Sequence, residues 1–212
     1  MIMKKFKNIA IAFSAAILLV GCADETTPTV ETEDESPTCF YSYNPGSTTM
    51  EWTAFKFTEK APVKGTFAEI NVDGTLESDD AMMLLSSLSF SIPISSINSQ
   101  NEERDGKIMK HFFGTISTEQ LTGKVVSLGE NGDAVLDVTM NGMTKPVNGK
   151  YTFEDGKFDF TSTIDVAAWD AIPAINALNT ICKDLHTSTD GKSKLWSEVD
   201  LMFSTTLKSD CD

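Results

Sequence analysis

The sequence predicts a mainly β protein, an antiparallel barrel or sandwich of eight or nine strands with one or two short helices. Apolar and polar residues alternate along many short segments, which is typical of strands with one buried face. Turn-forming pairs such as Asn141-Gly142 and Asp155-Gly156 separate neighbouring segments. No segment shows the strand–helix–strand rhythm of a parallel sheet. These observations favour the antiparallel all-β classes.

Most of the expected strands share a regular alternation. The clearest are residues 62–67, 70–76, 88–94, 134–140, 147–153, 158–166 and 199–207. Two more are expected near 50–57 and 121–128. The first of these is irregular, because Trp52 and Ala54 share one face while Phe55 and Phe57 share the other. That pattern predicts a bulge, or a strand buried on both sides.

Two segments have helical patterns. Ser78 is placed to cap a helix over 79–85, with acidic residues in its first turn. Residues 173–185 carry apolar side chains at helical spacing, and Pro173 occupies a tolerated position at the start.

The N-terminus has the features of an export signal. Lys4, Lys5 and Lys7 precede an uncharged apolar run over 9–20, which is too short to span a bilayer comfortably. The run ends in Leu-Val-Gly-Cys, which resembles the bacterial lipobox, and we therefore expect Cys22 to be lipidated. The resulting domains are a lipoprotein signal peptide over 1–21, an acidic disordered tether over 22–38 and a β domain over 39–212.

Localisation follows from this N-terminus. A lipidated Cys22 predicts stable membrane anchoring in a bacterial cell envelope, because several acyl chains bind more firmly than one. Ala23 follows the cysteine, where in some lineages an aspartate marks inner-membrane retention. We therefore expect the outer membrane, with the periplasmic and the cell-surface face both open.

Composition excludes several functions. The chain has 31 acidic and 17 basic residues, a formal net charge of −14, and Arg104 is its single arginine. Such a chain is a poor candidate for nucleic acid, where basic residues neutralise phosphates. With two histidines and no GxSxG, HExxH, GxxxxGK[ST], CxxC or GxGxxG motif, we expect no enzyme, metal site or cofactor. Arg104-Asp105 is the most notable polar pair; it could fix a loop at a cavity mouth or contact a head group, but we favour an exposed turn through Asp105-Gly106.

Four stretches together resemble the YceI-like family of polyisoprenoid-binding proteins. They read EWTAFKF (51–57) with VKGTF (63–67), SSIN (95–98) with RDGK (104–107) and FFG (112–114), LDVTMNGMTKPV (136–147), and a closing strand over 196–207. The resemblance spans about residues 50–208. It implies a lipocalin-like antiparallel barrel of about eight strands, with an apolar cavity for an isoprenoid-type lipid such as a quinone or polyprenyl chain.

The strand phases suggest which residues would line such a cavity. The candidates share one face within their strands: Phe67, Phe90, Ile92, Leu136, Val138, Met140, Phe160 and Phe203. A pocket of roughly 300–1,000 Å³ would be ordinary for such a ligand. The leading hypothesis is a lipid-anchored protein that sequesters or transports the lipid without catalysis. The alternative is a non-catalytic surface interaction or scaffold module whose barrel is packed.

Three cysteines remain if Cys22 is acylated, so at most one intramolecular disulfide can form. Closing a barrel brings the first and last strands together, which favours a Cys39–Cys211 bond and leaves Cys182 as a buried thiol on the helical stripe. Pairing of Cys182 with either of the others, or three unpaired thiols, remain the alternatives.

Overall fold

The computed structural model describes residues 39–211. The predicted signal peptide, Cys22 and the predicted tether lie outside the described residues. No helix within 39–211 is long and apolar enough to cross a membrane.

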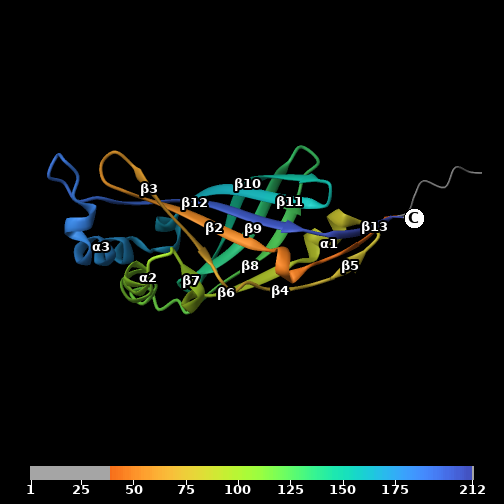
Figure 1. Ribbon diagram of the computed structural model, residues 1–212, viewed down its shortest axis with the longest axis horizontal. Helices are drawn as coiled ribbons and strands as arrows, with labels where there is room; N and C mark the ends of the chain where they lie inside the picture. The colour runs from red at the N-terminus through yellow and green to blue at the C-terminus, as the bar shows by residue number, and fades with distance from the viewer. Residues whose placement is uncertain (1–38, 212) are drawn as a thin grey trace, which may run out of the picture. The chain divides into compact units, whose positions relative to one another are not determined.

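Ten antiparallel strands form one curled sheet in the order β4-β6-β8-β9-β10-β11-β12-β2-β3-β7 (Figure 1). The strands are β2 (Thr49–Lys56), β3 (Ala61–Phe67), β4 (Asn71–Asp73), β6 (Ser89–Pro93), β7 (Ile97–Asn98), β8 (Gln120–Leu128), β9 (Asp133–Met140), β10 (Met143–Glu154), β11 (Lys157–Asp165) and β12 (Leu195–Thr206). β8, β9, β10 and β11 follow one another in the sheet through short turns, as hairpins do, whereas β12 pairs with β11 after a long connection that contains helical segments.

Two short strand pairs join the ends of this sheet. β3 is followed after a short bend by β4, and β6 is followed by a 3₁₀ turn (Ile94–Ser96) and then by β7. Phe67 pairs with Ile97, and Asn71 pairs with Ser91, so both pairings connect the same two chain segments. The ten strands therefore occupy about eight positions around the curled sheet. This confirms the mainly β, barrel-like fold expected from the sequence.

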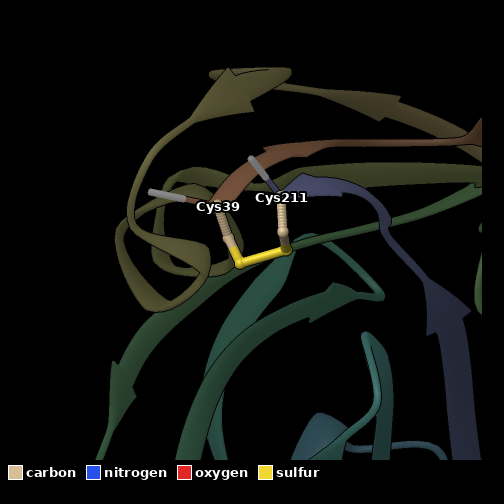
Figure 2. Close-up of a disulfide and its surroundings, with 2 residues drawn as sticks. All are labelled: Cys39 and Cys211. Carbon is tan, nitrogen blue, oxygen red and sulfur yellow. A yellow bond between two sulfur atoms is a disulfide. The ribbon is translucent and has the colours of Figure 1, made fainter. Parts of the chain in front are cut away.

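A small second sheet holds the chain ends of the domain. Its strands are β13 (Lys208–Cys211), β1 (Cys39–Ser42) and β5 (Glu77–Ser78), in that order. Cys39 lies directly opposite Cys211, and a disulfide joins them, as Figure 2 shows. Cys182 is an unpaired, buried thiol. The structure thus contains the favoured pairing, because antiparallel packing of the outermost strands places these two residues side by side.

The structure has three helices, α1, α2 and α3, and the two that were expected from the sequence differ from the expectation in their bounds. The first, α1 (Ala81–Ser87), is capped by Asp80, whose carboxylate accepts from two backbone N–H groups. The prediction of Ser78 as the cap was wrong, because Ser78 belongs to β5 and its hydroxyl accepts from the Asp80 N–H instead. The third, α3 (Ile172–Ile181), ends earlier than expected and is followed by a 3₁₀ turn, η5 (Lys183–His186).

The second helix was not predicted at all. α2 (Glu102–Ile108) runs into a π-helical turn, η3 (Met109–Phe113), where the sequence suggested an exposed turn through Asp105-Gly106. Asn101 caps the helix, and the buried Asp105 carboxylate accepts from the N–H and the hydroxyl of Ser99. These local bonds stabilise a helix despite the glycine at position 106. In Figure 1, α2 and α3 lie at the end of the sheet opposite to β13.

Candidate functional site

An apolar cavity of about 130 Å³ lies between the curled sheet and the two helical segments α2–η3 and α3. All of its lining side chains are apolar: Met50, Trp52, Ala54, Phe67, Ile97, Ile108, Phe112, Phe113, Leu121, Met140, Ile164, Val166, Ile175, Leu178, Leu195, Trp196, Val199 and Leu201. β2 and β12 contribute most of the sheet side of this wall. The lining residues alternate along β2, whereas on β12 the consecutive Leu195 and Trp196 both line the cavity, next to a register shift in its pairing with β2. A space of this kind favours an apolar guest and offers water no hydrogen-bond partner.

The π-helical turn shapes one wall of the cavity. Phe112 and Phe113 are adjacent in sequence, yet both are buried and both line the cavity. Their rings pack edge to face with centroids 4.9 Å apart. The wider turn of η3 thus directs two neighbouring aromatic rings into the interior, a local irregularity of the sort often found at functional sites.

A glycine allows Trp52 to cover the opposite wall. Gly65 pairs with Trp52 across β2 and β3, and an added Cβ at Gly65 would lie 2.2 Å from Cζ2 of the indole. The indole therefore occupies the space that a Cβ at position 65 would need. Any side chain at position 65 would push the indole towards the cavity.

The cavity adjoins a second, more polar space of about 340 Å³, which we call the vestibule. Both spaces are lined by Trp52, Ala54, Ile108, Leu178 and Leu195. The vestibule is further lined by Phe55, Lys56, Val63, Asn101, Glu103, Arg104, Lys107, Cys182, Leu185 and His186. A single elongated guest could therefore place an apolar part in the cavity and a polar part in the vestibule.

Burial favours the neutral form of two titratable groups in the vestibule. Burial raises the pKa of the Cys182 thiol, although the charge of Lys107 acts in the opposite direction. Burial also lowers the pKa of His186, and the charge of Lys56 lowers it further. The neutral imidazole donates from Nδ1 to Oδ1 of Asn179 at 2.9 Å. Neither group has the environment of an activated nucleophile or base.

Seven of the eight sequence-predicted cavity residues divide between two regions of the interior. Phe67 and Met140 line the 130 Å³ cavity. Ile92 is fully buried and lines neither that cavity nor the vestibule. The other five surround a void of only about 20 Å³ farther along the sheet: Phe90, Leu136, Val138, Phe160 and Phe203. There the aromatic rings pack tightly, and Phe90 and Phe203 stack with centroids 6.1 Å apart.

Several lining residues were missed from the sequence. The helix α2 could have been found from Asn101, from the acidic Glu102 and Glu103 of its first turn, and from the four-residue spacing of Ile108 and Phe112. The sequence analysis placed Trp52 in a strand and Leu178 in a helix, but it assigned neither residue to the cavity wall. Within residues 39–211 no three His, Cys, Asp or Glu side chains gather in a way that could hold a metal ion.

The curled antiparallel sheet and its apolar interior space define a β-barrel-like protein with an apolar cavity. The chain belongs to the YceI-like domain family, whose family model matches residues 41–207. A UPF0312 protein of Staphylococcus epidermidis is 34% identical to it over 102 residues, which cover 42% of this chain and 58% of that relative.

Two solved structures share the fold. A polyisoprenoid-binding domain from Saccharophagus degradans, implicated in plant cell wall breakdown, superposes with a TM-score of 0.57 and 11% identity, covering 82% of this chain and all of that one. BcnA of Burkholderia cenocepacia gives a TM-score of 0.52 with 14% identity, covering 79% and 99% of the two chains. At these identities the likeness concerns the fold alone.

Proposed function

We propose that this protein binds one isoprenoid-type lipid, such as a quinone or polyprenyl chain, inside the barrel and does so without catalysis. The observation that carries the proposal is the wholly apolar lining of the cavity, which continues into the vestibule along shared residues. The family relationship and the polyisoprenoid-binding domain with the same fold support an isoprenoid chain as the guest.

The cavity as it stands is smaller than the 300–1,000 Å³ of an ordinary ligand pocket, whereas the vestibule alone reaches that range. A long chain would therefore need the lining side chains to move. Met50 and Met140 can do so cheaply, since methionine has an unbranched and adaptable side chain. The tightly packed region around Phe160 supports the alternative of a scaffold barrel, and the test below separates the two.

The test combines extraction with a substitution that fills the site. Protein purified from its native membrane should release a stoichiometric isoprenoid lipid into organic solvent, as measured by mass spectrometry. Ala54→Phe places a ring where the cavity meets the vestibule, and protein with this substitution should release no such lipid. Val126→Phe is the matched control, because Val126 lies on β8 and is 51% exposed. This variant protein should still release the lipid. A wild-type protein that releases no lipid would establish the scaffold alternative.

We also propose that Cys22 is lipidated and anchors the domain to the bacterial outer membrane, where the bound lipid would be sequestered or transported. The support is the basic start, the apolar run and the Leu-Val-Gly-Cys sequence. Cys22→Ala should release the protein from membranes and prevent labelling with radioactive palmitate. Labelling that persists in this variant would refute the anchor.

A further inference from the structure

Positive charge gathers at the vestibule of a strongly acidic protein. Lys56, Arg104 and Lys107 line it, against a single carboxylate, that of Glu103. The whole chain carries a net charge of −14, and Arg104 is its only arginine. With 31 acidic and 17 basic residues, a random part of the surface would carry more acidic than basic side chains, so this local excess of cations is unusual for the chain.

Two of these cations have no carboxylate partner. Among residues 39–211, the ion pairs within 4 Å include neither Lys56 nor Arg104. The ammonium of Lys56 donates only to the backbone oxygen of Leu185, at 3.2 Å. Lys107 is paired with Glu103 at 2.6 Å, but the Glu103 side chain is 79% exposed and that of Lys107 only 26%. An anion in the vestibule could therefore draw on all three cations.

Arg104 is held in place by its neighbours. Its Nε donates to Oγ of Ser99 at 2.7 Å, and its Nη2 donates to the Ser99 backbone oxygen at 2.6 Å. Ser99 is in turn fixed by the buried carboxylate of Asp105. The guanidinium retains further N–H donors, since it carries five in all. A positioned guanidinium of this kind suits an oxyanion, which it can bind with paired hydrogen bonds.

We propose that the vestibule binds an anionic head group, a phosphate or carboxylate attached to the end of the apolar chain, and thereby selects charged over neutral isoprenoids. This inference rests on the proposed function, because the chain would occupy the adjoining cavity. Lys56 and Arg104 approach the head group from different elements, β2 and α2. A neutral head group such as a quinone would leave both charges without a counter-ion.

Three ligands with the same short isoprenoid chain test the proposal: farnesol, farnesoic acid and farnesyl phosphate. Binding can be measured by intrinsic tryptophan fluorescence, because Trp52 lines both spaces and Trp196 lines the cavity. At about 0.01 M salt we expect both anions to bind at least about tenfold more tightly than farnesol, and the difference to shrink strongly near about 1 M salt. A preference for the phosphate over the carboxylate would identify the source of the anion.

The variants separate charge from structure. Lys56→Gln and Arg104→Gln should each reduce the preference for anions, measured as the ratio of the affinity for each anion to the affinity of the same variant for farnesol. Arg104→Lys keeps the charge and should keep most of the preference. Lys208→Gln, with the same loss of charge at the exposed end of the domain, should change nothing.

Each outcome decides between the two proposals. If all three ligands bind with equal affinity, or farnesol binds best, the head-group inference is overturned while binding of the apolar chain stands. If none binds, the proposed function and this inference both fail.

Discussion

Removing the Cys39–Cys211 disulfide should destabilise the domain substantially. The two cysteines are separated by 172 positions, so the bond closes nearly the entire described chain into one loop. In the chain-entropy model, opening a loop of this length raises the entropy of the unfolded state by an amount equivalent to about 5 kcal/mol at 25 °C. Removal of native disulfides typically costs about 2–5 kcal/mol, and we expect Cys39→Ser/Cys211→Ser to fall in that range.

Urea denaturation followed by tryptophan fluorescence measures this loss. The double variant should unfold at lower urea than the wild type, and the wild type with dithiothreitol should coincide with the double variant. Reduction should be possible in the folded state, because Cys211 is exposed on β13. Cys182→Ala retains the disulfide and should respond to dithiothreitol as the wild type does, which makes it the matched control.

The reasoning fails if the double variant keeps the urea midpoint of the wild type. All four residues of β13 are exposed, so the small sheet buries little apolar surface of its own. An unchanged midpoint would mean that β1 and β13 detach before the barrel unfolds. The disulfide would then restrict two chain ends without limiting the entropy of the unfolded barrel.

Three further changes have defined expectations. Gly65→Ala should displace the Trp52 indole, lower the unfolding free energy by about 1–3 kcal/mol and abolish lipid binding, as shown by denaturation and extraction. Asp80→Ala removes the cap of α1 and should cost about 1 kcal/mol in urea denaturation; a loss near zero would contradict the capping role. Because burial and then Lys56 lower the pKa of His186, the unfolded state binds more protons just below the ordinary value of 6.5, so stability should fall as the pH drops through that region towards the folded pKa. His186→Gln should remove this part of the pH dependence of the urea midpoint, and an unaltered pH profile would argue against it.

Local patterns in the sequence were enough to predict most of the long strands and their inward faces. The expected strand over 70–76 was wrong in its length, because only β4 forms there and Leu76 is exposed. Side chains alternate between the two faces of a strand whatever the strand packs against, so Leu136, Val138 and Met140 could be placed on one face from their spacing alone. The Cys39–Cys211 bond could also be favoured from the sequence. Closing a barrel brings its first and last strands together, and the two cysteines flank those strands. The helix α2 was missed because Gly106 and the Asp105-Gly106 pair are turn signals, whereas its stability depends on Ser99 and Asn101 outside it.

The position of a residue along the barrel was decided only by the tertiary structure. The alternation of residues along a strand separates inward-facing from outward-facing side chains. It does not determine which side chains of other strands lie at the same level along the barrel. Phe160 and Met140 both face inward, yet one lies among tightly packed rings and the other lines the open cavity. The cavity and its charged vestibule exist because curling of the sheet and packing of α2 and α3 bring Trp52, Arg104 and Leu178 together from distant parts of the chain. Contacts of such long range leave no periodic trace in the sequence, because each depends on how the whole sheet curls and on which helix covers its end.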